Sequence, residues 1–420
     1  MKPWWRALRG VVLGSTIAAC INIPPFQKKD AGPQGDGSTI GSGVVATVQN
    51  NSIDVSNQPL YHVMFGSEPY HYPYAMTVGA TSVMGGGNPS SCNDEFDMGI
   101  GLYPAPHIIG HGGTSPVQDD IAIDFAGPPV AKVNLEWQTQ FQCSGSNGTA
   151  SGRSMFTFFP DGRINRSDQV TLGSTQLDST MCACGAGGNW YLTSFFTTMA
   201  ATTNTVAGAI VPTTSTSAGN PADPAVCFNG HQNAFQFAMG WRSGSSARVR
   251  TPVEGTNATI AFVYDLVPGG TSTTIGPVTG RGQTTWWVST SSSCGALLDQ
   301  VAPYADNSGH SLPTLNVQAG AGTVQPIGVA LDGIFGGENG QGSMGYQSAD
   351  PVIKLTTDAA LAGFAFWLAL GSGEEIASVT KSPAMPDPWY GQQIRNGSNH
   401  RLFWFPDGLQ PGQTITITIK

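Results

Sequence analysis

Arg166 and Asp168 are the residues whose types and spacing most directly suggest a binding site. They belong to segment 163–172, RINRSDQVTL, in which side chains alternate between two faces if the segment is a β-strand. Both charges then share a face with apolar residues, whereas the other face is wholly polar and is predicted to face solvent. An unpaired charge on a half-buried face is costly. The two residues are therefore expected either to form a structural ion pair or to contact an anionic or polyhydroxyl ligand on the floor of a concave sheet.

Aromatic and imidazole side chains supply a second set of candidates. Tyr72 and His71 lie in the aromatic segment 68–76, EPYHYPYAM. Aromatic rings stack on the apolar faces of sugars, and Tyr or His can act as an acid or base, so His71 is a candidate catalytic residue and Tyr72 a candidate binding residue. The alternative is a loop whose rings cover a sheet. Trp286 and Trp287 are adjacent and point to opposite faces of a strand, which predicts that at most one is core and that Trp287 could bind a ligand.

Metal ligands are indicated at one place. Asp94, Glu95 and Asp97 follow Cys92, and carboxylate oxygens of this kind bind Ca²⁺ in exported proteins. An acidic turn beside a disulfide is the alternative, and no cofactor other than Ca²⁺ is expected. His107 and His111 are four residues apart, but the prolines and glycines around them oppose the helix that a zinc site of this spacing requires.

The cysteine content indicates disulfides. Six cysteines remain when Cys20 is set aside, and an even number in an exported chain suggests up to three bridges. Cys182 and Cys184 would point the same way in a strand, so each is expected to reach a different partner. The six predicted disulfide cysteines are Cys92, Cys143, Cys182, Cys184, Cys227 and Cys294.

The elements that must position these residues are predicted to be strands. The run Met155–Phe159 is followed by the turn Pro160-Asp161-Gly162 and by the alternating segment 163–172, which together predict a hairpin. The same turn recurs at Pro406-Asp407-Gly408, and serines before residues 294–301 predict one short helix. Many short alternating segments and few long helical patterns predict an all-β fold. We expect a large antiparallel β-sandwich over residues 44–290 and a smaller C-terminal β-sandwich over residues 315–420.

The N-terminus resembles a bacterial lipoprotein signal peptide. A basic start with Lys2, Arg6 and Arg9 precedes a short apolar stretch, and Ile17-Ala18-Ala19-Cys20 matches the lipobox. The resemblance implies that residues 1–19 are removed, that Cys20 is acylated, and that residues 20–43 form a flexible tether to the membrane. Ile21 after the cysteine resembles the outer-membrane class of Gram-negative lipoproteins, so the expected location is the cell envelope.

Composition excludes one class of partner. The chain has 18 basic and 27 acidic residues and a net charge of −9, which argues against binding nucleic acid. The layout of the body is loosely similar to that of exported β-sandwich proteins that handle polysaccharides. The sequence thus predicts a membrane-anchored envelope lipoprotein that binds a glycan or polysaccharide. A polysaccharide lyase or glycosidase, with Arg166, Asp168 and His71 in one cleft, and a structural or adhesive envelope protein are the alternatives, so enzymatic activity is left open.

Overall fold

The fold is seen in a computed structural model of the chain. It describes residues 43–49, 52–65, 73–84, 100–101, 118–143, 146–172, 175–176, 191–196, 205–210, 225–229, 235–243, 248–250, 260–265, 274–275, 278–304, 314–320, 325–328, 352–361, 363–383 and 400–420. The predicted all-β class is confirmed, because antiparallel strands dominate and the described part of the chain contains a single short α-helix. None of the helical residues described there forms a segment long and apolar enough to cross a bilayer.

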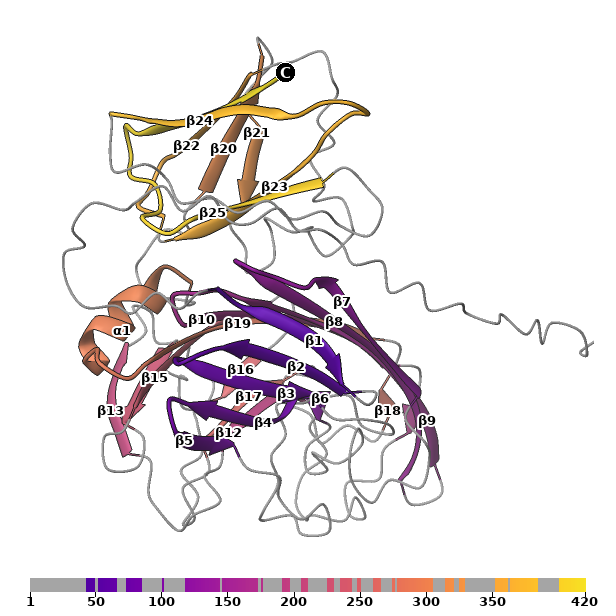
Figure 1. Ribbon diagram of the computed structural model, residues 1–420. Coiled ribbons are helices and arrows are strands. Elements are labelled where there is room, and N and C mark those ends of the chain that lie inside the picture. Colours follow the sequence, from indigo (N-terminus) through magenta and orange to yellow (C-terminus); the bar gives the residue numbers. More distant parts are fainter. Residues whose placement is uncertain are drawn as a thin grey trace, which may run out of the picture.

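The larger lobe is a sandwich of two antiparallel sheets, in which an eight-stranded sheet arches over a five-stranded one (Figure 1). The five-stranded sheet runs in chain order through β1 (Val45–Gln49), β2 (Ser52–Asn57), β3 (Tyr61–Phe65), β4 (Pro73–Val78) and β5 (Thr81–Met84). The eight-stranded sheet has the order β13-β14-β15-β19-β10-β9-β8-β7. Its strands are β7 (Gln118–Phe125), β8 (Ala131–Cys143), β9 (Ser146–Phe158), β10 (Arg163–Leu172), β13 (Thr205–Ile210), β14 (Ala225–Asn229), β15 (Gln236–Ser243) and β19 (Val278–Ser289).

Aromatic rings fill the space between these two sheets. Phe65 of β3 packs edge-on against Phe156 of β9 at 5.2 Å between ring centroids, and Phe158 lies 6.2 Å from Phe65. Each ring is at most 1% exposed. Burying one such side chain contributes roughly 1.5–3 kcal/mol, so this aromatic layer is a principal source of the sandwich's stability.

Two smaller sheets complete the described part of the larger lobe. One has the order β16-β17-β12-β6 and the other pairs β11 with β18. Their strands are β6 (Ile100–Gly101), β11 (Thr175–Gln176), β12 (Tyr191–Phe196), β16 (Arg248–Arg250), β17 (Ile260–Asp265) and β18 (Thr274–Ile275).

The C-terminal lobe is a smaller two-sheet sandwich above the eight-stranded sheet (Figure 1). Its five-stranded sheet has the order β21-β20-β22-β26-β24, and β23 pairs with β25 in the layer nearer the larger lobe. In β26 every second residue is buried, as the alternating sequence TITITI predicts. The strands are β20 (Thr314–Ala319), β21 (Gln325–Gly328), β22 (Val352–Thr357), β23 (Phe364–Ala369), β24 (Ile376–Ser382), β25 (His400–Phe405) and β26 (Thr414–Ile419).

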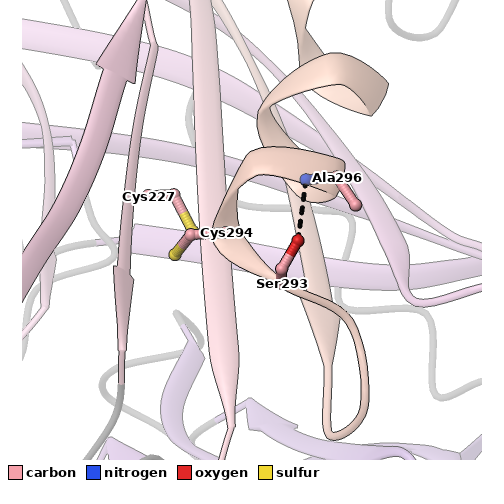
Figure 2. The surroundings of a disulfide bond; sticks show 4 residues. All are labelled: Cys227, Ser293, Cys294 and Ala296. Atoms are coloured by element: carbon pink, nitrogen blue, oxygen red, sulfur yellow. Dashed lines mark hydrogen bonds between the residues drawn. A yellow bond between two sulfur atoms is a disulfide. The ribbon is translucent and has the colours of Figure 1, made fainter.

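A short helix follows the last strand of the larger lobe. The helix α1 (Cys294–Val301) begins after Ser293, whose hydroxyl accepts a hydrogen bond from the N–H of Ala296, as the predicted serine cap requires (Figure 2). It continues into the 3-10 helix η2 (Ala302–Tyr304). A disulfide joins Cys294, the first residue of α1, to Cys227 of β14 (Figure 2). The helix is thereby fixed against one side of the eight-stranded sheet.

Candidate functional site

The predicted hairpin forms, but both faces of its second strand are covered over the residues whose side chains are described, 163–166. Arg163 and Asn165, which were expected to face solvent, are 1% and 6% exposed. That expectation is wrong because Arg163 packs against Tyr304 of η2 and Trp404 of the C-terminal lobe, elements that follow the hairpin by well over a hundred residues. The face that appears polar in the sequence is therefore an interior face at the junction of the two lobes.

Arg163 is the centre of this junction. Its guanidinium donates to the hydroxyl of Tyr304 at 3.0 Å and to the carbonyl oxygen of Gly363 at the start of the C-terminal lobe's β23. The carbon of the guanidinium lies 4.0 Å from the centre of the Phe159 ring and 5.9 Å from that of Trp404. Charge, hydrogen bonds and cation–π contacts thus join the two lobes at one side chain.

The turn that precedes Arg163 is held from two sides. From the five-stranded sheet, Tyr61 donates its hydroxyl proton to the carbonyl oxygen of Phe159 at 3.0 Å, and Asn57 donates to the carbonyl oxygen of Pro160 at 3.1 Å. On the other side Trp287 donates its indole N–H to the carbonyl oxygen of Asp161 at 3.1 Å. Desolvation raises the pKa of the Asp161 carboxyl above its ordinary 3.8, although the nearby Arg163 guanidinium acts in the opposite direction.

Arg166 lies on the predicted apolar face, but it does not face a surface. It is 1% exposed, and its guanidinium lies over the ring of Phe156 at 5.4 Å, in the layer between the two sheets of the larger lobe. Asp168 continues β10 opposite Gly282 and Ser154, and only its backbone is described. Arg166 is thus enclosed by the sandwich and is unsuited to contact a ligand from outside.

The expectation that one of the two adjacent tryptophans is exposed is wrong. Trp286 is 0% exposed and lies in the aromatic layer near Phe156 and Phe237. Trp287 is 4% exposed and belongs to the core at the lobe junction. Both faces of β19 are covered at these two positions, so Trp287 cannot offer its ring to a ligand from solvent.

A row of polar side chains crosses the eight-stranded sheet beside the junction. Thr157 of β9 is directly opposite both Lys132 of β8 and Asn165 of β10, and Asn165 is opposite Thr285 of β19. Directly paired residues of antiparallel strands project from the same face, so these four side chains lie in one line, which we call the polar row. Their exposed fractions are 3% for Lys132, 1% for Thr157, 6% for Asn165 and 0% for Thr285.

Three members of the polar row have unsatisfied oxygen atoms. Within the described part of the chain, Thr157 Oγ1, Asn165 Oδ1 and Thr285 Oγ1 are buried and have no hydrogen-bond partner. A buried polar atom without a partner costs about 1–3 kcal/mol, and native proteins contain few of them. The three lie in register, about 4.8 Å apart from strand to strand, and they are covered from solvent as Arg166 and Trp287 are.

The same face continues outward to exposed polar groups. Asn134 and Glu136 follow Lys132 at alternate positions of β8, and Arg153 of β9 is directly opposite Glu136. Arg153 Nε donates to Asn134 Oδ1 at 2.8 Å and lies 3.5 Å from Glu136 Oε1. The Arg153 and Glu136 side chains are 35% and 61% exposed. We call the polar row together with Asn134, Glu136 and Arg153 the polar strip, which runs from the lobe junction toward solvent.

Several predicted site residues lie outside the described part of the chain. These include the candidate base His71, the aromatic Tyr72 and the lipidated Cys20. The predicted calcium ligands Asp94, Glu95 and Asp97 lie there as well. Among the described residues, no group of three or more His, Cys, Asp or Glu side chains could hold a metal ion. Of the predicted disulfide cysteines, Cys227 and Cys294 are bonded, the side chain of Cys143 is not described, and Cys92, Cys182 and Cys184 lie outside.

The polar strip was not predicted from the sequence. Thr157 stands inside the run MFTFF, and Thr285 precedes two tryptophans, so each resembles an ordinary strand residue. Their relation depends on the pairing of four strands spread over residues 131–289. The one local signal is the alternation of polar residues Arg163, Asn165 and Ser167, which was assigned to solvent.

Comparison with known proteins gives distant structural likenesses. No family model matches the chain, and no curated protein matches it. Heparinase III matches with a TM-score of 0.33 at 9% identity over 78% of this chain and 43% of that chain. A heparan sulfate lyase from Pedobacter heparinus gives 0.31 at 7% identity over 76% and 40%. A glycoside hydrolase family 97 enzyme from Pseudoalteromonas sp. gives 0.28 at 13% identity over 59% and 36%. This chain spans about two fifths of the length of the heparinase structures, and at these scores the likenesses do not decide its activity.

Proposed function

We propose that this protein is a lipoprotein of the bacterial cell envelope, anchored in the outer membrane through Cys20, that binds a glycan on the polar strip. The anchor is supported by the order of basic, apolar and lipobox residues at the N-terminus. The tether 20–43 would hold the body away from the membrane, and β1 begins directly after it at Val45.

One observation carries the glycan proposal: at the outer end of the strip, Arg153 donates to Asn134 and lies 3.5 Å from Glu136, and the Arg153 and Glu136 side chains are 35% and 61% exposed. Sugar hydroxyls can donate to the carboxylate and carboxamide oxygens and accept from the guanidinium. Thr157, Asn165 and Thr285 are at most 6% exposed, so they lie beneath this surface and would not contact the glycan.

A lyase or glycosidase built on Arg166 is not proposed. A catalytic group must lie within hydrogen-bond reach of the substrate, and this guanidinium lies between two sheets with 1% of the residue exposed. The exposed end of the strip is instead suited to binding, since Arg153, Asn134 and Glu136 can exchange hydrogen bonds with sugar hydroxyl groups.

Binding is tested with the full-length protein, purified in detergent, on a glycan array and in affinity gels. The variant Arg153→Met keeps an apolar stem and removes the guanidinium that faces the proposed site. We expect glycan binding to weaken about tenfold or more, while stability changes by less than about 1 kcal/mol, because exposed ion pairs contribute little. Lys354→Met, on an exposed position of β22, is the matched control and should bind normally.

Two results contradict the glycan proposal. Failure of the wild type to bind any glycan would favour a structural or adhesive role. Normal binding by Arg153→Met would place a glycan site elsewhere. The anchor is tested separately by mass spectrometry of the mature N-terminus, where Cys20→Ser should abolish acylation and release the protein from the membrane.

A further inference from the structure

We propose that the loop 126–129 clamps the chain where it enters the body, so that tension on the membrane tether passes through β1 to β8, the strand that carries Asn134 and Glu136. This inference rests on the proposed function for the source of the tension, which is the lipid anchor at Cys20. A protein that is held at the membrane and bound to a glycan outside it is pulled between these two attachments. The path between them must therefore resist force.

The entering chain is hydrogen-bonded on both of its edges. On one edge β1 pairs with β2 over its whole length. On the other edge the N–H of Val44 donates to the carbonyl oxygen of Pro129 at 2.9 Å. Two residues later the N–H of Ala46 donates to the carbonyl oxygen of Ala126 at 2.7 Å. The chain therefore enters the body between β2 and the loop 126–129, which joins β7 to β8.

Two glycines allow the entering chain and the loop to approach closely. Gly43 has a φ of +106°, and a Cβ atom there would lie 2.7 Å from Pro128 Cβ. Gly127 has a φ of +80°, and a Cβ atom there would overlap the carbonyl oxygen of Val44 and lie 2.8 Å from its carbonyl carbon. Residues with a side chain rarely adopt such φ values. The contact thus depends on a glycine in the chain and on a second glycine in the loop.

The clamp belongs to the interior of the protein. Val44 and Val130 are 0% exposed, and Ala46 is 3% exposed. At the base of the loop Lys132 Nζ lies 3.7 Å from Asp124 Oδ2, and the two side chains are 4% and 17% exposed. This ion pair joins the end of β7 to the start of β8, so it links the two ends of the loop that holds the chain.

One strand connects the clamp to the exposed end of the polar strip. The loop is followed by Val130 and then by β8, whose residues Asn134 and Glu136 lie in the strip. β8 is paired on both edges, with β7 and with β9. Detaching β1 also requires the bonds on both of its edges to break, and hydrogen bonds that are left unmade in the interior are costly. Tension should therefore be passed on to the eight-stranded sheet without first detaching β1.

The clamp is tested by pulling single molecules of the full-length chain in magnetic tweezers. One handle is attached at Lys28 in the proposed tether and the other at Glu136, each through an azide-bearing residue introduced at that position. The pull then follows the proposed path and needs neither a lipid nor a glycan. Residues 43–49 span about 25 Å when extended. We expect the first rupture to lengthen the molecule by clearly more than this, because β1 stays attached until the sheet itself opens.

Gly127→Ala should weaken the clamp. The added Cβ atom would displace Val44, so we expect β1 to detach before the sheet opens, at least about tenfold faster at the same force. The matched control is Gly373→Ala, because Gly373 has a similar φ of +83° but, in the described part of the chain, no atom beyond its neighbours within 4 Å of an added Cβ. It should leave the rupture unchanged. Gly43→Ala is a second variant, expected to act in the same direction if Gly127→Ala does not fold.

Hydrogen exchange measures the clamp without force. In Gly127→Ala the amides of Val44 and Ala46 should exchange at least about tenfold faster than in the wild type, while that of Ile353 in the C-terminal lobe should not change. Unchanged exchange at Val44 and Ala46 would show that the loop does not hold the chain.

The outcomes separate this inference from the proposed function. Release of β1 as the first event in the wild type would overturn the clamp and leave the anchor and glycan proposals intact. Equal rupture rates in the wild type and in the glycine variants would overturn it as well. An unacylated Cys20 would remove the source of the tension, and with it the role of the clamp at the membrane, whatever the pulling experiment shows.

Discussion

The ring of Phe159 lies 5.4 Å from the ring of Trp404, at an interplanar angle of 41°. Phe159 immediately precedes the first Pro-Asp-Gly turn, and Trp404 stands two residues before the second, so the two similar turns of the chain approach each other across the lobe junction. Both turns have a glycine with positive φ and an N–H that donates to the carbonyl oxygen three residues earlier. The contact joins hydrophobic residues of both lobes in one core, and we therefore expect the lobes to unfold as one cooperative unit.

Arg163 should be the most sensitive residue of this junction. Arg163→Met keeps an apolar stem against Phe159 but leaves the Tyr304 hydroxyl and the Gly363 carbonyl oxygen without this donor. Since a hydrogen bond to a charged group is worth about 1.5–3 kcal/mol, we expect the free energy of unfolding to fall by about 3 kcal/mol in a urea titration. Arg163→Lys should lose less, because one ammonium can still donate to one of the acceptors.

The control for Arg163 is Lys354→Met on an exposed position of β22, which should change stability by less than about 0.5 kcal/mol. An Arg163→Met protein as stable as the wild type would show that the two lobes do not depend on this side chain.

Gly363 should not tolerate a side chain. A Cβ atom at this position would lie 2.7 Å from Trp404 Cη2 and 2.8 Å from the carbonyl oxygen of Pro406, and neither the ring nor the backbone can move freely. We expect Gly363→Ala to lower the free energy of unfolding by about 1–3 kcal/mol.

The matched substitution is Gly295→Ala in α1, where the nearest atom to an added Cβ is Ser293 Oγ at 3.9 Å. It should raise stability by about 0.5–1 kcal/mol, because alanine favours a helix. If Gly363→Ala raises the urea midpoint as Gly295→Ala does, the close approach at Gly363 does not destabilise an added side chain.

The strand pattern was predictable from the sequence because it depends on local properties. Only residues a few positions apart determine the alternation in β26, the turn at 160–162 and the serine cap of α1. The turn requires a glycine at position 162, because a Cβ atom there would lie 2.3 Å from the carbonyl oxygen of Val288.

The cover over Arg163 and the polar row could not be predicted in this way. An arginine followed by alternating polar residues has the pattern of a solvent-facing strand, and burial is imposed by Tyr304 and Trp404 from far along the chain. Similarly, Lys132 and Thr285 are separated by more than 150 positions in the sequence, yet they belong to one row only because β8, β9, β10 and β19 pair in a particular register.

The disulfide between Cys227 and Cys294 should contribute substantially to stability. It joins residues 67 apart, and a closed loop of this length lowers the entropy of the unfolded chain by an amount worth about 4 kcal/mol in the loop-closure model. We expect the double variant Cys227→Ala/Cys294→Ala to lose about 2–4 kcal/mol under oxidising conditions, measured by urea unfolding. A loss below about 1 kcal/mol would indicate that packing of Leu297 and Val301 alone holds α1 in place.

Asp161 should make stability fall as the pH rises above 3.8. Burial raises the pKa of its carboxyl in the folded protein, so the folded state binds more protons than the unfolded state between 3.8 and the raised pKa. The contribution of this group to stability is therefore greatest below 3.8 and is lost as the pH rises through the folded pKa. In Asp161→Asn the carboxamide oxygen can still accept the Arg163 N–H, and the dependence on pH should be absent. Urea unfolding of both proteins from pH 3 to pH 8 should show the variant gaining on the wild type as pH rises. A constant difference would mean that folding leaves the pKa of Asp161 unchanged, and a shrinking one would mean that its charged form is stabilised.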